Sequence, residues 1–374
     1  MHLIIDGSNI KEEGGGLIHL IKLVDFYKNQ NNTTLTIISS KKTLNKLKDH
    51  KFLIKKHINS FVENNIFLRL IWQKFYINKK NFKNYDLLIT LGGISFSNFK
   101  PAIVLCQNLL PFSKDQYYKY SIINKIKLFV QSRLYLISFN NAQGVIYMTK
   151  ASKEIIEKNG FNISTNYEII HHGKKQSDQN LRKYNNFNKL NSFKLLYVSR
   201  YQPYKNHIKL IECFDELTKL EFNLNLTLIF PESYKSFSKI KKILFNKTKN
   251  KKIILKNDLN NFELSKEYKK ADCLVYPSEC ETFGIPLVEA ASFSLPIACT
   301  NYSVFKEILD NTGDYFDIND KESIKRTIIK LYENIDYLRH KSSLILKKSK
   351  VYSWNNCMNK YHNYIVKIIT NEKK

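Results

Sequence analysis

Long apolar runs, paired cysteines and acidic side chains are all scarce in this sequence of 374 residues. No run of about 18 apolar residues occurs, so we expect no transmembrane helix. The first ten residues, MHLIIDGSNI, predict a buried strand and a turn. They lack the basic start and the cleavage site of a secretory signal, so we expect the protein to stay in the cytoplasm.

The cysteines are few and scattered. None of the six belongs to a CxxC pair. Free thiols in a reducing compartment explain this distribution better than a disulfide framework or a zinc site does. His171 and His172 are adjacent, but neighbours on a strand point to opposite faces, so they do not indicate a metal pair.

Lysine dominates the charge. The sequence holds 60 basic and 33 acidic residues, a formal net charge of +27. The excess is spread evenly along the chain, whereas a nucleic-acid reader more often concentrates basic and aromatic residues on one element, so we expect no nucleic-acid partner. A compositional bias toward Lys, Asn and Ile explains the charge, and so does attraction to an anionic membrane surface. Both can hold together.

Strand-like and helical segments alternate along the chain. The length exceeds that of one typical core, and the alternation predicts parallel α/β sheets covered on both faces. We expect two Rossmann-like domains, over residues 1–173 and 193–353, joined by a polar linker over 174–192. Residues 354–374 predict a helix whose apolar stripe needs a surface to cover.

Two stretches of the first domain have weaker patterns. Residues 41–56 are basic and only partly periodic, and they predict no strand. Residues 58–76 predict a single amphipathic helix.

The stretch from Tyr276 to Pro296, YPSECETFGIPLVEAASFSLP, has the most specific pattern. An apolar strand leads into it, a Thr-Phe-Gly turn follows Glu281, and Pro286 opens an Ala-rich helix that carries Glu289. A strand, a glycine turn and a helix N-terminus together direct backbone N–H groups toward an anionic ligand. Our hypothesis is that this ligand is a nucleotide-sugar diphosphate.

Other polar groups also follow predicted strands. Gly14, Gly15 and Gly16 follow the first strand, and Gln107 and Asn108 follow a middle one. Ligands of open parallel sheets bind beyond the carboxyl ends of the strands, so we expect these groups to line a cleft between the two domains. The glycines can equally form a flexible turn.

In the second domain, the loop after the first strand carries two cations. Arg200 and Lys205 stand five positions apart in the segment SRYQPYKN. We expect this loop to lie near the Glu281 turn, because both loops follow strands of the same predicted sheet.

These motifs carry a family resemblance. The Ser-Arg and Lys-Asn pairs of residues 199–206, the run YPSECETFGIPLVEA, and the Tyr-Ser-Trp of residues 352–354 resemble the donor-binding half of family-4 retaining glycosyltransferases with the GT-B fold. Residues 107–112, 141–149 and 169–173 are similar to bacterial members that build surface polysaccharides. The resemblance implies two Rossmann-like domains that face each other, with the C-terminal helix packing back on the N-terminal domain.

The resemblance assigns roles to the charged residues. It implies that Arg200 and Lys205 bind the donor diphosphate, as a guanidinium fork and an ammonium point charge do on a pyrophosphate. It implies that Glu281 acts beside the donor sugar and that Glu289 accepts hydrogen bonds from the ribose. The alternatives are two ordinary solvated cations and a glutamate that merely stabilises its helix.

The remaining assignments are also implied by the resemblance. The donor side would include the backbone N–H groups of Thr282, Phe283 and Gly284, and Asn257, which stands where such enzymes often carry a glycine. Gly14, Gly15, Gly16, Gln107 and Asn108 would lie on the acceptor or donor-sugar side.

The expected activity follows from this resemblance. It is retaining transfer of a hexosyl-type group from a nucleotide-diphosphate sugar to a glycan or lipid-linked acceptor, in lipopolysaccharide, O-antigen or capsule synthesis at the inner face of the plasma membrane. No metal and no cofactor are expected, because the donor is a co-substrate and no Asp-x-Asp follows a predicted strand. The alternatives are a nucleotide-sugar epimerase of the same fold and a non-catalytic basic protein that binds membranes or nucleic acid.

Overall fold

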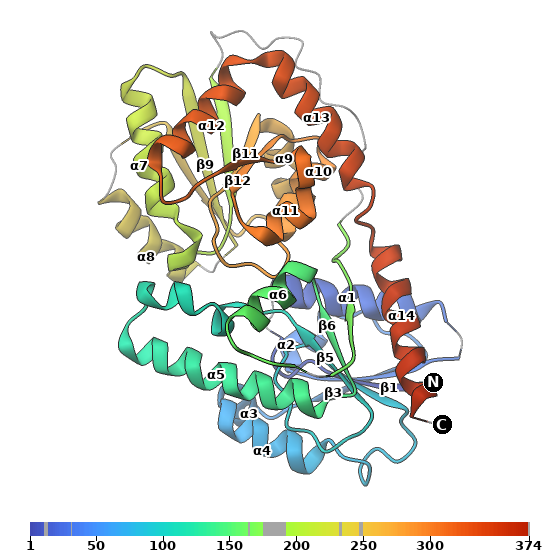
Figure 1. The fold of residues 1–374 in the computed structure, drawn as a ribbon. Coiled ribbons are helices and arrows are strands. Elements are labelled where there is room, and N and C mark those ends of the chain that lie inside the picture. Colours follow the sequence, from blue (N-terminus) through green and yellow to red (C-terminus); the bar gives the residue numbers. More distant parts are fainter. Residues whose placement is uncertain are drawn as a thin grey trace. The chain divides into compact units, whose positions relative to one another are not determined.

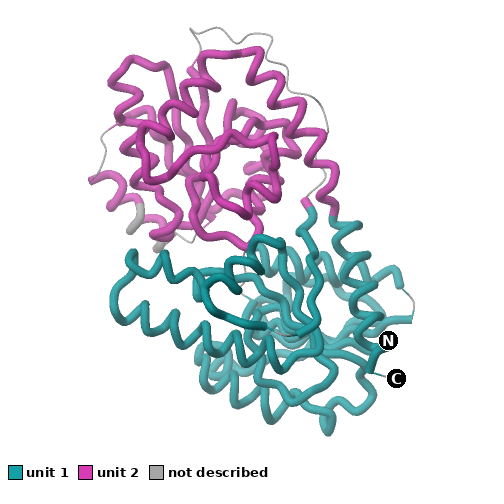
Figure 2. The backbone as a smooth tube through the Cα atoms, in the orientation of Figure 1, with its two compact units in different colours: residues 1–173, 354–374 teal, residues 174–353 magenta. Residues whose placement is uncertain are grey.

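The chain forms two compact α/β units (Figure 1). The computed structural model describes residues 1–10, 14–30, 32–163, 165–174, 192–231, 234–246 and 250–372. Unit 1 consists of Met1–Gly173 and Trp354–Lys374, and unit 2 of Lys174–Ser353 (Figure 2). Most of the predicted linker, residues 174–192, lies outside the described residues.

Unit 1 is built on a seven-stranded parallel sheet in the order β3-β2-β1-β4-β5-β6-β7. Its inner strands are mostly apolar because helices cover both faces. Leu3, Ile4 and Ile5 of the first strand are fully buried. The strands are β1 (His2–Asp6), β2 (Thr34–Ser39), β3 (Leu53–His57), β4 (Leu87–Thr90), β5 (Ala102–Cys106), β6 (Gly144–Tyr147) and β7 (Tyr167–Ile169).

The helices of unit 1 include the last one of the chain. They are α1 (Gly15–Lys28), α2 (Lys41–Leu44), α3 (Ser60–Asn64), α4 (Ile66–Tyr76), the 3-10 helices η1 (Leu110–Phe112) and η2 (Lys114–Lys119), α5 (Ile122–Asn141), α6 (Lys150–Lys158) and α14 (Trp354–Asn371). α14 packs against α1 and buries Met358, Tyr361 and Ile365. The apolar stripe of the sequence thus covers unit 1, as the resemblance predicted.

Unit 2 is built on a six-stranded parallel sheet in the order β10-β9-β8-β11-β12-β13. The strands are β8 (Phe193–Val198), β9 (Leu224–Phe230), β10 (Ile253–Asn257), β11 (Cys273–Tyr276), β12 (Ile297–Thr300) and β13 (Asp314–Phe316). The helices are η3 (Pro203–Lys205), α7 (His207–Lys219), α8 (Tyr234–Phe245), α9 (Asn261–Lys270), α10 (Ile285–Ser292), α11 (Ser303–Leu309), η4 (Asp310–Thr312), α12 (Lys321–Glu333) and α13 (Ile335–Ser349). Among the described residues, none of the helices combines the length and the apolar character that a bilayer-crossing segment needs.

Both sheets reverse their strand order once. In unit 1 the reversal lies between β1 and β4, and in unit 2 between β8 and β11. At such a switch point the two connecting chains leave in opposite directions, so the loops at the carboxyl ends part and leave room for a ligand. The two-domain α/β fold class predicted from the sequence is confirmed, and the switch points show where binding loops belong.

Two predictions for unit 1 are wrong in detail. Residues 41–56 contain most of the edge strand β3, whose sequence Leu-Ile-Lys-Lys-His hides the strand pattern because an edge strand is only partly buried. The predicted single helix over 58–76 is broken at Asn65, whose side chain accepts hydrogen bonds from the backbone N–H groups of Phe67 and Leu68. This cap ends α3 and starts α4.

Candidate active site

The loop after β8 buries a lysine. Lys205 ends the short helix η3, and its carbonyl oxygen accepts a hydrogen bond of 2.6 Å from the Tyr197 hydroxyl. Asn206 then adopts a left-handed backbone, with φ of 53°, and α7 begins at the next residue. This turn leaves Lys205 only 8% exposed, so its ammonium group needs partners inside the protein.

The loop after β11 supplies those partners. The Tyr276 hydroxyl donates to Oε1 of Glu281 at 2.7 Å, and the Ser278 hydroxyl donates to the same oxygen at 2.9 Å. Nζ of Lys205 forms an ion pair with this oxygen and lies 3.3 Å from the Tyr276 hydroxyl. Three donors therefore converge on one carboxylate oxygen, which fixes the orientation of Glu281.

Backbone and amide contacts hold the two loops together. Nδ2 of Asn206 donates to Oε2 of Glu279 at 2.6 Å and to the Pro277 carbonyl at 2.9 Å. The Glu279 backbone N–H donates to the Tyr204 carbonyl at 3.0 Å. Hydrogen bonds thus join the loops after β8 and β11 at the switch point of the sheet.

Glu289 lies on α10, beyond the Thr-Phe-Gly turn. Gly284 caps this helix in the left-handed region, with φ of 92°. The Tyr268 hydroxyl donates to Oε2 of Glu289 at 2.9 Å. Burial, and then the Glu289 charge, raise the pKa of Tyr268 well above its usual value, so the phenol stays protonated and remains a donor.

The turn itself has a structural and a binding part. The Phe283 ring is buried and packs edge-on against Tyr352, with ring centroids 5.7 Å apart. A side chain at Gly284 would approach Leu287 at 3.0 Å and Phe305 at 3.2 Å. Any ligand contact of Phe283 and Gly284 would therefore use their backbone.

Arg200 and Asn257 are two more of the predicted donor residues. Arg200 is half-buried in the loop after β8, and Asn257 is half-buried at the end of β10. Within the described part of the chain, the Arg200 guanidinium makes no hydrogen bond or ion pair to a protein group.

In unit 1 the predicted site residues lie at the carboxyl edge of the sheet. Gly14 caps α1 with φ of 93°, and Gly15 is the first residue of that helix. A Cβ on Gly16 would lie 3.2 Å from Oε1 of Gln107, so the glycine loop and the loop after β5 adjoin. Asn108 is exposed, and its Oδ1 accepts from the Leu110 N–H at 3.2 Å.

Several polar residues of these sites escaped the sequence analysis. Asp6 ends β1 and is buried, where Gln73 of α4 donates to its Oδ2 at 2.6 Å and the Ser8 N–H donates to its Oδ1 at 3.0 Å. Burial raises the pKa of Asp6 above its usual value. The signal for Asp6, as for Tyr276, was a polar group at the last position of an apolar strand.

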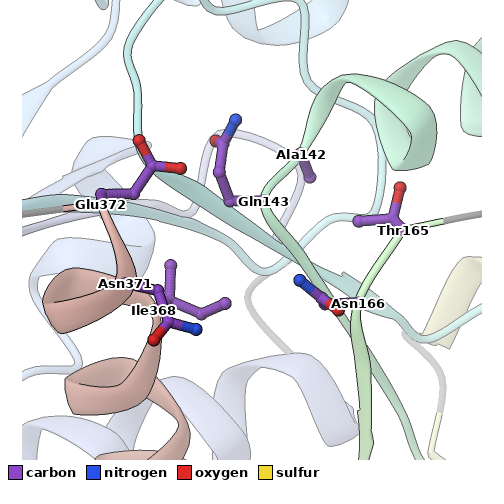
Figure 3. A pocket seen from close by; sticks show the side chains of 7 residues that line it. All are labelled: Ala142, Gln143, Thr165, Asn166, Ile368, Asn371 and Glu372. Atoms are coloured by element: carbon purple, nitrogen blue, oxygen red, sulfur yellow. The ribbon is translucent and has the colours of Figure 1, made fainter. Parts of the chain in front are cut away.

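One cavity of unit 1 lies away from these loops (Figure 3). It has a volume of about 250 Å³, and Gln143, Asn166 and Glu372 are among its lining residues. Gln143 and Asn166 precede β6 and β7, so this cavity lies at the amino edge of the sheet. It holds none of the predicted site residues.

The second unit matches a known family over most of its length. Residues 178–343 match the family of group 1 glycosyl transferases. The Lys205–Glu281 group and Glu289 both fall inside this group 1 segment, so the resemblance of the second unit to glycosyltransferases is confirmed. Among the described residues, no group of three or more His, Cys, Asp or Glu side chains is arranged to hold a metal ion.

Curated relatives match only part of this chain. The O-antigen chain mannosyltransferase B of Escherichia coli is 26% identical over 164 residues, which are 43% of this chain and 42% of the relative. The chain spans less than half the length of the curated relatives it matches.

Solved structures share the whole fold. Sucrose-phosphate synthase from Thermosynechococcus elongatus aligns with a TM-score of 0.77 at 14% identity, over 99% of this chain and all of that chain. HepE of Anabaena, solved with UDP and glucose, aligns with a TM-score of 0.72 at 14% identity, over 98% of this chain and all of that chain. These alignments identify the fold as that of GT-B glycosyltransferases.

Proposed function

We propose that this protein is a retaining, metal-independent glycosyltransferase. It would transfer a sugar from a nucleotide-diphosphate donor to a glycan or lipid-linked acceptor in the synthesis of a bacterial surface polysaccharide, at the cytoplasmic face of the plasma membrane. The observation that carries the proposal is the convergence of Lys205, Tyr276 and Ser278 on Glu281 at the switch point of a group 1 segment.

The cations suit the leaving group. When the anomeric bond breaks, negative charge grows on the bridging oxygen of the departing nucleoside diphosphate. Cations that are already in place stabilise that charge without a cost of reorganisation. Lys205 is held by its partners before the donor arrives, and Arg200 lies five residues away in the same loop.

The glutamates suit the two ends of the donor. Glu281, oriented by three donors on one oxygen, can accept hydrogen bonds from sugar hydroxyls and stabilise positive charge at the anomeric carbon. Glu289, oriented by Tyr268, can accept hydrogen bonds from the ribose. Neither carboxylate binds the diphosphate itself, because like charges repel.

The relatives support the substrate classes. The mannosyltransferase relative is named for the O-antigen chain, and HepE was solved with UDP and glucose. We therefore propose a hexose donor activated by a nucleoside diphosphate and a polysaccharide precursor as acceptor. In unit 1, Gly16 and Gln107 adjoin at the carboxyl edge, and we propose that this region contacts the acceptor or the donor sugar.

A thermal-shift screen against UDP and GDP sugars tests the donor. A donor at about 100 times its Kd stabilises the protein by about 2.7 kcal/mol. The selected donor is then incubated with polysaccharide precursors, and the product linkage is read by NMR. A product with the anomeric configuration of the donor supports the proposal. Conversion of the donor without any acceptor would instead indicate an epimerase.

A further inference from the structure

Helices α3, α4 and α5 of unit 1 expose large apolar side chains to solvent. Six of them have exposed fractions between 59% and 79%. We call this set the apolar face: Phe61, Phe67, Phe75, Ile122, Ile123 and Ile126. Single exposed apolar residues are ordinary on protein surfaces, but a cluster of this kind marks an interaction site.

The helices that carry the apolar face are neighbours. The Ser95 N–H donates to Ser138 of α5 at 2.9 Å, and the next residue, Phe96, donates its N–H to Gln73 of α4 at 3.3 Å. The chain passes from β3 through α4 to β4 and from β5 through α5 to β6 in the same direction across the sheet. Right-handed crossovers therefore place both helices on one face of it (Figure 1).

The apolar face lies within cationic segments. Residues 60–83 and 114–141 together hold ten Lys and Arg against two Asp and Glu. Lys74 and Lys127 are exposed on the same helices, between the apolar side chains. Helices that lie in the interface of an anionic bilayer typically expose Phe and Ile on one side, with lysines beside them.

The charge argues against other occupants. A second copy of this chain on a two-fold axis would bring the same cationic patch against itself. The three phenylalanine rings could stack on bases, but the other half of the apolar face consists of isoleucines, which offer a nucleic acid neither hydrogen bonds nor ring stacking. We propose that the apolar face docks on an anionic lipid bilayer.

Docking would also orient the acceptor loops. Helices that connect parallel strands run antiparallel to them, so α3 and α5 begin at the carboxyl edge of the sheet. Ile122 and Ile123 follow the loop that contains Gln107 and Asn108. If the proposed function holds, the bilayer surface would then lie beside the region assigned to a lipid-linked acceptor.

Vesicle co-sedimentation of the full chain tests the docking. We expect binding to vesicles of phosphatidylglycerol and phosphatidylcholine that is at least about tenfold stronger than binding to phosphatidylcholine alone. The triple variant Phe67→Ser/Ile123→Ser/Ile126→Ser should weaken the binding by about tenfold or more. Raising the salt from about 0.1 M to about 1 M, which shortens the screening length from about 10 Å to about 3 Å, should weaken it as well.

Phe262→Ser is the matched control. Phe67 and Phe262 both stand second in a helix capped by an asparagine, and they are 66% and 67% exposed. The control should bind vesicles as the parent chain does. Three results would overturn the proposal. The first is equal weakening in both variants, and the second is unchanged binding in the triple variant. The third is a parent chain that forms a dimer in solution while the triple variant is a monomer.

The proposed function is tested by a separate measurement, the thermal shift with the donor sugar. The triple variant should keep the thermal shift produced by the donor sugar. Vesicle binding without any donor shift would leave the docking intact and contradict the glycosyltransferase assignment, and the reverse result would contradict only the docking.

Discussion

The Tyr276 hydroxyl lies 2.7 Å from Oε1 of Glu281 and donates a hydrogen bond to it. The same hydroxyl accepts from Nζ of Lys205 at 3.3 Å. Burial raises the pKa of Tyr276 well above its usual value, and the Glu281 charge raises it further. The phenol therefore stays protonated and connects the cation to the carboxylate.

Tyr276→Phe should lower kcat by about tenfold, the effect of about 1.4 kcal/mol of lost positioning in the transition state. The donor KM should change little, because Glu281 keeps Ser278 and Lys205 as partners. Tyr364→Phe is the control, since it removes a buried hydroxyl that bonds to the Asn166 carbonyl in unit 1. If steady-state kinetics show the same loss of kcat in both variants, the role of Tyr276 is structural and not one in positioning.

Lys205→Ala should lower kcat by about 100-fold to 1,000-fold, as loss of one preorganised charge donor does elsewhere. The fold should persist, because Glu281 retains two hydroxyl donors. Circular dichroism checks the fold and product formation checks the rate. Lys219→Ala, at the exposed end of α7, should leave both unchanged. Near-normal turnover in Lys205→Ala would contradict the assigned role.

Glu289→Gln should remove most transferase activity and raise the donor KM by about tenfold or more, because an amide accepts weaker hydrogen bonds from the ribose than a carboxylate does. Tyr268 can still donate to the amide oxygen, so we expect little loss of stability. Glu333→Gln, exposed at the end of α12, serves as the control in the same kinetic assay. An unchanged donor KM would rule out ribose binding by Glu289.

Activity should survive an excess of EDTA. The proposed mechanism neutralises the leaving diphosphate with Arg200 and Lys205 instead of a divalent cation. Turnover is measured after dialysis against the chelator, with and without added Mg²⁺ or Mn²⁺. A rate that falls with EDTA and returns with a metal would show that a metal is required.

Unit 1 should lose stability in mild acid. Nδ1 of His19 and Nδ1 of His172 lie 3.3 Å apart in its core. Burial lowers the pKa of both, that of His172 to about 4, and each is lowered further by a neighbouring histidine. Between about pH 6.5 and about pH 4 the unfolded chain therefore binds more protons than the folded one, so stability falls as the pH falls.

For His172 alone this loss is about 3 kcal/mol over that range. Urea unfolding at a series of pH values measures it. His19→Gln should flatten the dependence, whereas His57→Gln, on the exposed edge strand, should not. A free energy of unfolding that stays constant from pH 6.5 to pH 4 would contradict the prediction.

Much of the site is local in the sequence. The strand, the Thr-Phe-Gly turn and the helix around Glu281 and Glu289 occupy one continuous stretch, so their order alone predicted an anion site. Apolar runs separated by helical stripes likewise predicted two parallel sheets. The edge strand β3 escaped because two lysines interrupt its apolar residues, and an irregular pattern of this kind has no local signature.

The sequence by itself therefore determined the fold class, the family resemblance and the identity of the charged residues. Only the tertiary structure brought Lys205 to Tyr276 and Glu281, which are 71 and 76 residues further along the chain. They meet because β8 and β11 are hydrogen-bonded neighbours in the sheet. Strand order results from packing and crossover connections across the whole unit, and no short-range pattern of residues encodes it.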